Sequence, residues 1–243
     1  MGIKNQIHIG TSGWSYPHWK SCFYAHIAKK DWLSHYATQF NTVEINASFY
    51  RLQSQQTFQT WCEQTPDEFR FSLKANRYVT HSKRLNDPLD SVLIEKQHAQ
   101  YLQPKLACVL WQLPKNQAKD IIKLQHFVVA LTHWQDVYHI IEFRHQSWFD
   151  DETKKILASH NVAPCISDAA DWPIWLTISD DLLYIRLHGH TQTYASHYTK
   201  SHLQQWAQRI ANHNNVWIYF DNDAKCAAIK NAIELQALTH SFS

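Results

Sequence analysis

Apolar and polar residues alternate along several short runs of this chain. In the run 138–144, Ile141 and Phe143 alternate with Glu142 and Arg144. Successive side chains of a β-strand point to opposite faces, so each such run offers one apolar face and one polar face. The same alternation occurs in NTVEINASFY, FRFSLKAN, LLYIRLHG and VWIYFDND. If the apolar faces lie against helices, the polar faces converge on an interior where unpaired charge is destabilising. This pattern predicts a functional site there.

The runs that predict strands lie near residues 6–11, 41–47, 69–75, 106–113, 138–144, 162–168, 182–188 and 215–221. Segments with helical periodicity separate most of them, at 31–40, 54–64, 88–102, 120–134, 153–160, 200–213 and 224–239. In the segment 200–213, Leu203, Trp206 and Ile210 form an apolar stripe at helical spacing. After the sixth run, AADWPIWLTISDD is short and interrupted by proline, so we expect a turn or a short helix there.

Strands that alternate with helices about eight times predict a parallel sheet with its helices outside. In 243 residues this favours a closed (β/α)₈ barrel in a single domain over residues 1–243. A doubly wound open sheet is the competing fold, and it usually has a glycine-rich phosphate turn after its first strand. The segment GTSGWS does not have that pattern, and the whole chain contains only 4 glycines. The barrel is therefore the predicted fold.

The net charge, the absence of long apolar stretches and the cysteine spacing limit the kinds of partner and compartment that the sequence predicts. The net charge is +2, which argues against a broad nucleic-acid surface but leaves room for a local basic pocket. No stretch of about 18 apolar residues predicts a membrane span, and no signal-peptide pattern opens the chain. The cysteines form no C-x-x-C pair, so we expect reduced, mostly buried thiols in a cytoplasmic protein. They are Cys22, Cys62, Cys108, Cys165 and Cys226.

A series of long motifs follows in order along the chain. They are IGTSGWSYPHW, FNTVEINASFYRL, FSLKANRYVTHSKRL, LWQLP, EFRHQSWF, SDAADWP, YIRLHG and YFDNDAKCAAIKNA. Each resembles a signature block of the YecE-like family (domain of unknown function 72), and together they cover nearly the entire chain. The resemblance implies a TIM-barrel fold, in agreement with the count of strands and helices, and it implies no particular reaction. The chain departs from the family pattern at Asp221, where Asn is more usual, and at Cys226, where Gly is common.

In a barrel of this kind the active site forms at the carboxyl ends of the strands. We take Glu44, Glu142, His188 and Asp168 as the candidate catalytic residues, with Glu44 and Glu142 as the acid/base pair, because two carboxylates flanked by cations can acquire different pKa values. The candidate substrate-binding residues share strand ends or the loops that follow them. They are Trp14, Ser15, Asn46, Tyr50, Lys74, Arg77, Gln112, Arg144, Arg186, Asp221 and Asp223.

The cations among these residues point to the ligand class. Lys74, Arg144 and Arg186, together with His188, favour a carboxylate or phosphate group. We therefore expect an enzyme that acts on a small or terminal anionic substrate by acid/base chemistry, without a cofactor. The sequence leaves the oligomeric state open.

Other interpretations stay open at this point. The same residues could form a salt-bridge network that only seals the barrel, or a cavity in a non-catalytic binding or scaffold protein. A protein of nucleic-acid metabolism that binds a strand end or a flipped nucleotide is a further alternative, which the near-neutral charge disfavours. A divalent metal site is possible but not favoured, and glycoside hydrolysis is disfavoured. A glycosidase needs a carboxylate pair at a defined separation, and cations stand between the possible metal ligands.

Overall fold

Eight parallel strands form the centre of the computed structural model, which describes residues 6–179 and 182–239. They are β1 (Gln6–Thr11), β2 (Thr42–Ile45), β3 (Arg70–Lys74), β4 (Leu106–Gln112), β5 (Tyr138–Glu142), β6 (Val162–Ala169), β7 (Leu183–Gly189) and β8 (Asn215–Phe220). Each pairs with its neighbours in the order β1-β8-β7-β6-β5-β4-β3-β2. The (β/α)₈ barrel predicted from the sequence is therefore confirmed, and the predicted strand runs agree closely with the strands observed.

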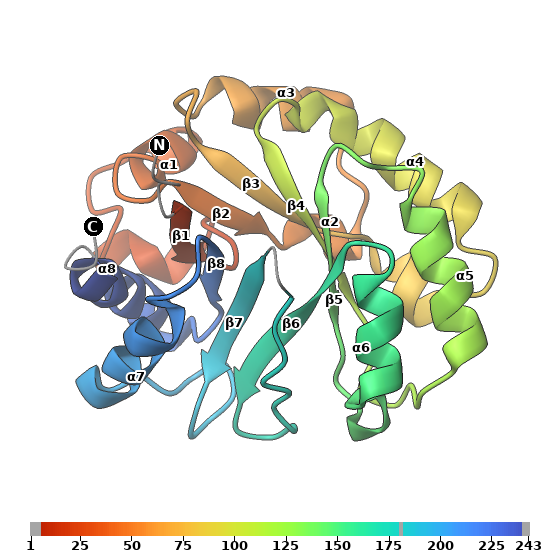
Figure 1. Cartoon of the computed structure of the whole chain (residues 1–243). Coiled ribbons are helices and arrows are strands. Elements are labelled where there is room, and N and C mark those ends of the chain that lie inside the picture. Colours follow the sequence, from red (N-terminus) through yellow and green to blue (C-terminus); the bar gives the residue numbers. More distant parts are fainter. Residues whose placement is uncertain (1–5, 180–181, 240–243) are drawn as a thin grey trace, which may run out of the picture.

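Helices surround the strands (Figure 1). The α-helices are α1 (Trp32–Tyr36), α2 (Ala47–Tyr50), α3 (Gln55–Glu63), α4 (Leu89–Ala99), α5 (Ile121–Leu131), α6 (Asp151–Ala158), α7 (Lys200–Ile210) and α8 (Ala227–Thr239). Shorter helical turns are η1 (Pro17–Ser21), η2 (Lys29–Asp31), η3 (Tyr78–Ser82), η4 (Gln100–Leu102), η5 (Gln146–Trp148) and η6 (Ala224–Cys226). Within the two described ranges, no helix is long and apolar enough to cross a membrane.

The barrel closes between β1 and β2 through very few backbone contacts. Ser12 and Glu44 form an isolated bridge, and the Gly13 amide donates to the Glu44 carbonyl oxygen at 2.7 Å. At this seam a Cβ on Gly10 would lie 2.2 Å from the Thr42 carbonyl oxygen, so no other residue fits without moving β2. The close approach of β1 and β2 brings the loop after β1 against the site at the end of β2.

The sequence predicts a turn or a short helix between β6 and β7. In the described part of this segment the structure has a turn at residues 170–171 and no helix. The ring of Trp175 takes that place, and it stacks on Phe149 with the ring centroids 5.2 Å apart. Trp175 also meets Phe143 edge-on at 5.9 Å. Aromatic packing thus covers the outside of the barrel where a helix would otherwise lie.

The alternation of the strands divides the core into two parts. Val43, Ile45 and Leu73 pack on the outside of the barrel against the helices, as their period predicts. Inside the barrel, a second apolar cluster fills the end opposite the strand carboxyl ends, and it includes Leu110, Ile140 and Trp217. Above that cluster the inward-facing positions are polar. The apolar layers therefore support a polar layer at one end of the barrel.

Glu95 of α4 is a buried carboxyl outside this polar layer, with 3% of its surface exposed. Burial raises its pKa from 4.5 to about 8, although the Asn76 amide donates a hydrogen bond to it. The folded protein therefore binds this proton more tightly than the unfolded chain does. Its contribution to stability is present below about pH 4.5 and is lost as pH rises towards 8.

Glu95→Gln should remove the decrease in stability that occurs as pH rises from 4.5 towards 8. The amide keeps the shape of the side chain and the acceptor for the Asn76 amide, but it cannot ionise in the unfolded chain. We expect the free energy of unfolding to rise by about 3 kcal/mol at pH 7 and to stay unchanged near pH 4. Urea titrations at the two pH values measure this difference. Glu68→Gln, at an exposed position, is the matched control and should change neither value. An equal effect of Glu95→Gln at both pH values would contradict the assignment.

Candidate active site

Arg186 of β7 stands at the centre of the polar layer, with its side chain fully buried. Its Nη2 lies 2.7 Å from Oε1 of Glu44, and its Nε lies 3.0 Å from Oε2 of the same carboxylate. Its Nη1 donates to Glu142 Oε2 at 2.9 Å, and its Nη2 donates to Asp221 Oδ2 at 3.1 Å. A single guanidinium therefore ties together the carboxyl ends of β2 and β5 and the residue that follows β8.

Glu142 has a second cation and a hydroxyl as partners. Arg144 Nε donates to its Oε1 at 2.9 Å, and Ser167 Oγ donates to the same oxygen at 3.0 Å. Burial alone would raise the pKa of Glu142, but the Arg144 and Arg186 guanidiniums outweigh it and hold the pKa well below its usual range. Glu142 is therefore a fixed negative charge at neutral pH.

Asp221 and His188 extend the network towards the barrel mouth. His188 Nδ1 lies 2.9 Å from Asp221 Oδ2, and its Nε2 lies 3.5 Å from Glu142 Oε1. Burial favours the neutral form of Asp221, but Arg186 and His188 outweigh this effect and lower its pKa. The rings of Trp172 and Tyr194 meet the imidazole edge-on, with centroids 5.0 and 5.6 Å away. The imidazole is thus held between a carboxylate and two aromatic rings.

Lys74, at the end of β3, is the cation of this layer that the network leaves without an acid. Its side chain is buried, and Nζ lies 4.3 Å from the centroid of the Phe49 ring. Among the described residues, no carboxylate lies within 4.0 Å of its Nζ. Burial and the charge of Arg186 lower its pKa from 10.5 to about 8, against the opposing effect of the nearby carboxylates. Lys74 therefore exchanges its proton much closer to neutral pH than an exposed lysine does.

Lys74 opens onto a cavity of about 830 Å³. Asp221 shares its inner end, and Trp14 and Trp61 form part of its wall, with ring centroids 4.9 Å apart at right angles. The cavity extends outward to Lys29 and Lys30 of η2. Its other lining residues are Gly13, Ser15, Tyr16, Leu33, Asn46, Ala47, Tyr50, Thr60, Gln64 and Tyr194. Its size and its mixture of aromatic and charged side chains suit a small ligand.

Most of the site residues predicted from the sequence meet in this network or line the cavity. Asn46 Nδ2 donates to Ser12 Oγ at 2.6 Å, and Ser12 Oγ in turn donates to Glu44. Gln112 is buried next to Glu142 in the register of β4 and β5. Trp14, Ser15 and Tyr50 line the cavity. The strand periodicity therefore brings these residues together at one end of the barrel.

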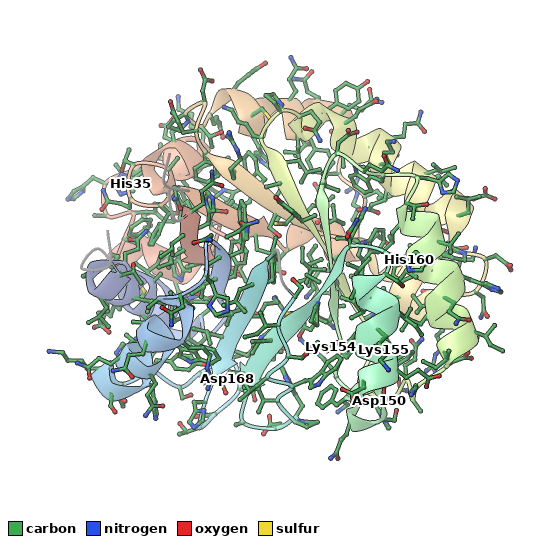
Figure 2. The ribbon with its side chains drawn as sticks, viewed as in Figure 1. His35, Asp150, Lys154, Lys155, His160 and Asp168 are labelled. Carbon is green, nitrogen blue, oxygen red and sulfur yellow. A yellow bond between two sulfur atoms is a disulfide. The ribbon has the colours of Figure 1, made fainter. Side chains whose placement is uncertain are left out.

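Three predicted residues lie elsewhere. Asp168 is at the arrowhead end of β6 (Figure 2), where its carboxylate contacts His190 Nδ1 at 3.1 Å instead of the Arg186 network. Its neighbour Ser167 holds the inward position. Arg77 is exposed, and its guanidinium lies 5.9 Å from the centroid of the Phe49 ring. Asp223 contacts His18 Nε2 at 3.0 Å and accepts a hydrogen bond from the Trp19 indole.

Sequence reasoning missed several residues of the site. Tyr184 donates to Glu44 Oε2 at 2.8 Å, and Ser12 accepts from Arg186 Nη2 at 3.0 Å. Tyr184 lies on the inward face of β7, and Ser12 follows β1 directly with the same alternation, so the alternation itself could have identified them. Lys29, Lys30 and Trp61 reach the cavity from elements outside the barrel. No signal in the strand pattern points to these three.

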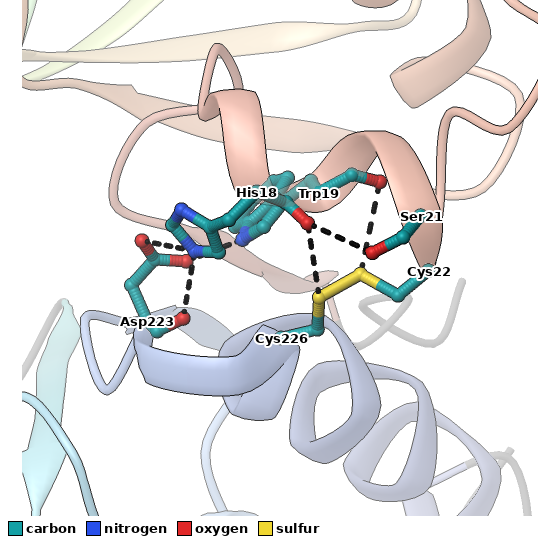
Figure 3. Close-up of a disulfide and its surroundings, with 6 residues drawn as sticks. All are labelled: His18, Trp19, Ser21, Cys22, Asp223 and Cys226. Atoms are coloured by element: carbon teal, nitrogen blue, oxygen red, sulfur yellow. Dashed lines mark hydrogen bonds and ion pairs between the residues drawn. A yellow bond between two sulfur atoms is a disulfide. The ribbon is translucent and has the colours of Figure 1, made fainter.

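The structure differs from the prediction that the cysteines are reduced thiols. Cys22, the residue that follows η1, and Cys226 of η6 form a disulfide with their Cα atoms 6.7 Å apart, whereas Cys62, Cys108 and Cys165 are free thiols. Figure 3 shows the disulfide beside the contacts of Asp223 with His18 and Trp19. The expectation that all five thiols are reduced was wrong because closure of the barrel brings together residues 204 positions apart in the sequence.

The carboxylates of the network already have cationic partners. In the part of the chain that the structure describes, no group of three or more His, Cys, Asp or Glu side chains is arranged to hold a metal ion. The charged groups of the polar layer that also line the cavity are the amine of Lys74 and the carboxylate of Asp221.

Comparisons with known proteins agree on one family. Residues 8–242 match the family model described as Protein of unknown function DUF72. The UPF0759 protein YunF of Bacillus subtilis (strain 168) is 25% identical over 96% of this chain and 94% of its own length. The UPF0759 protein YecE of Escherichia coli (strain K12) is 30% identical over 59% of this chain and 50% of its own length.

Solved structures show the same fold. A DUF72 family protein from Thermotoga maritima MSB8 matches with a TM-score of 0.85 and 24% identity, over 97% of this chain and 99% of that chain. A second DUF72 family protein, from Enterococcus faecalis V583, matches with a TM-score of 0.82 and 16% identity, over 97% of this chain and 96% of that chain. The barrel is therefore common to these proteins.

Proposed function

This chain belongs to the family of proteins of unknown function DUF72, and for this member we propose an enzyme that acts on a small or terminal anionic substrate by acid/base chemistry at the carboxyl end of the barrel. The expected anionic groups are phosphate and carboxylate. The substrate lies in the cavity between Lys74, Asp221 and the outer lysines Lys29 and Lys30.

One observation carries the proposal: the charges that line the cavity are unbalanced. Lys29, Lys30 and Lys74 line it, while Asp221 is the single carboxylate among the lining residues and already contacts Arg186. Within the described residues, no carboxylate lies within ion-pair distance of any of these three lysines. A cavity with this surplus of cations attracts an anion, and desolvation strengthens the attraction at the buried Lys74.

The residues of the buried network have a structural role, and the residues that line the cavity have a chemical one. Arg186 holds Glu44 and Glu142 as buried partners, so these two carboxylates fix the positions of the strand ends. Lys74 and Asp221 are the amine and the carboxylate of the layer that line the cavity. An amine of pKa about 8 and an ionised carboxylate can donate and accept a proton near neutral pH. We assign proton transfer to this pair.

Inorganic phosphate tests the proposal as the simplest anion. Phosphate should raise the melting temperature of the wild-type protein, with an effect that saturates, and Lys74→Met should abolish that rise. Lys155→Met, on the exposed surface of α6 (Figure 2), is the matched control and should retain it. Equal stabilisation of the wild type and of Lys74→Met by phosphate would contradict the proposed site.

Lys74→Met should also stabilise the protein without ligand. The pKa of Lys74 falls from 10.5 to about 8 on folding, so its charge destabilises the folded state at pH 7 by about 3 kcal/mol. The wild type should gain stability as pH rises from 8 to 10.5, whereas Lys74→Met should show no such gain from this position. Urea titrations across this pH range measure both effects. A destabilised Lys74→Met at pH 7 would show that the lysine has a structural partner.

A further inference from the structure

Lys74 differs from the other lysines of the chain for which side-chain partners are described. Lys105 is also buried, but its Nζ donates to the Cys62 and Thr65 carbonyl oxygens, each at 2.7 Å. Lys119 forms ion pairs with Asp150 and Glu152. Lys74 has neither backbone acceptors nor a carboxylate within such distances in the described structure, and it lines the cavity of about 830 Å³. Its amine is thus accessible to a ligand.

We propose that Lys74 is a nucleophile that condenses with the aldehyde or ketone group of an anionic substrate to form an imine. This inference rests on the proposed function and specifies its substrate class as carbonyl compounds that carry a phosphate or carboxylate. A lysine becomes an effective nucleophile when it is desolvated or lies beside another cation. Lys74 meets both conditions, because it is buried and the charge of Arg186 acts on it.

The reaction is balanced without a cofactor or an oxidant. The lone pair of the neutral amine forms a bond to the carbonyl carbon, and the π electrons of the carbonyl move to its oxygen. Two protons pass from the nitrogen to that oxygen, the C–O bond breaks, and water leaves as the C=N bond forms. Asp221 lines the same cavity and is ionised, so it can take each proton from nitrogen and deliver it to the departing oxygen.

The other end of the cavity accommodates the anionic group of the substrate. Lys29 and Lys30 lie on η2, outside the barrel, whereas Lys74 lies at the end of a barrel strand. Trp14 and Trp61 line the cavity between the barrel and the outer helices. A substrate with its carbonyl at Lys74 and its phosphate towards Lys29 and Lys30 would therefore extend along this aromatic wall.

Reductive trapping tests the inference with glyceraldehyde 3-phosphate as the probe. The protein is treated with this aldehyde and cyanoborohydride, which reduces an imine to a stable secondary amine, and the modified peptides are identified by mass spectrometry. We expect labelling of Lys74 at least about tenfold above the average of the surface lysines, and none at Lys105. The rate of labelling should rise with pH around 8, because the neutral amine is the reactive form.

Two comparisons make the test specific. Glyceraldehyde, which lacks the phosphate, should label Lys74 several-fold more slowly than glyceraldehyde 3-phosphate does. In the variant Lys29→Gln/Lys30→Gln, glyceraldehyde 3-phosphate should label Lys74 only as fast as glyceraldehyde labels it in the wild type. Asp221→Asn should slow the labelling of Lys74 without changing that of the surface lysines. Labelling of Lys74 no faster than that of surface lysines would overturn the inference.

The outcome separates this inference from the proposed function. If phosphate stabilises the protein through Lys74 but no adduct forms there, Lys74 binds an anion and the imine proposal is overturned. If neither effect occurs, the proposed function fails as well.

Discussion

Replacing Arg186 with methionine is expected to leave the protein unfolded at neutral pH. The guanidinium is fully buried and contacts Glu44, Glu142 and Asp221, so its removal leaves three carboxylates with less positive charge around them. Breaking one buried ion pair in this way destabilises a protein by roughly 3–5 kcal/mol. With three acids affected, we expect a loss above about 5 kcal/mol, which is comparable to the whole stability of many domains.

Circular dichroism and urea titration measure this loss. Arg209→Met, which removes an exposed guanidinium that lies over Trp206, is the matched control and should cost less than about 1 kcal/mol. Adding Glu44→Gln and Glu142→Gln to Arg186→Met should restore part of the stability, because the carboxylates no longer carry unpaired charge. An Arg186→Met protein as stable as the wild type would show that the network is not what holds the strand ends together.

The second large effect is expected from the disulfide between Cys22 and Cys226. It closes a loop across a sequence separation of 204 residues, so it strongly restricts the unfolded chain. We expect Cys22→Ser to lower the free energy of unfolding by about 4 kcal/mol under oxidising conditions. Thermal unfolding with and without dithiothreitol measures the effect, and the reductant should lower the wild type to the level of the variant.

The backbone at Cys226 provides a sharper comparison. Its φ is +62°, and that of Lys225 is +56°, a region that non-glycine residues seldom adopt. Glycine, which the resemblance to the family gives as common at this position, would relieve that strain. We therefore expect Cys226→Gly to be about 1 kcal/mol more stable than Cys226→Ser, although both lack the disulfide. A wild type whose melting temperature is unchanged by reduction would contradict the structural role of the bond.

The disulfide also affects an expectation about location. Disulfides are rare in cytosolic proteins, where thiols are kept reduced. The cytoplasmic location predicted from the sequence therefore stays a prediction, and the state of Cys22 in the isolated protein bears on it directly.

The fold could be predicted from the sequence because the alternation of apolar and polar positions is a local property of each strand. The run 138–144 became β5 (Tyr138–Glu142), and the proline-broken segment after the sixth run has no helix in its described part. The same alternation placed Glu44, Glu142 and Arg186 on one inner layer. These residues were predictable because a strand fixes the face of every second side chain.

The remaining features depend on tertiary packing. Asp168 lies beside an irregularity in the pairing of β6 with β7, and the inward position belongs to Ser167. The sequence shows that an acid ends this strand, but the register decides which face it takes. Lys29 and Lys30 line the cavity only because the folded chain brings η2 to the same cavity as Lys74 and Asp221. The pairing of Cys22 with Cys226 likewise requires the barrel to be closed.

A crystal of the wild-type protein soaked in selenate shows whether an anion binds at Lys74, because selenium gives an anomalous signal at the position of the anion. We predict a peak within hydrogen-bond distance of Lys74 Nζ in the wild-type cavity, and no peak there in Lys74→Met. Selenate bound only at other surfaces, or an ordered Lys74 ammonium in contact with a carboxylate, would contradict it.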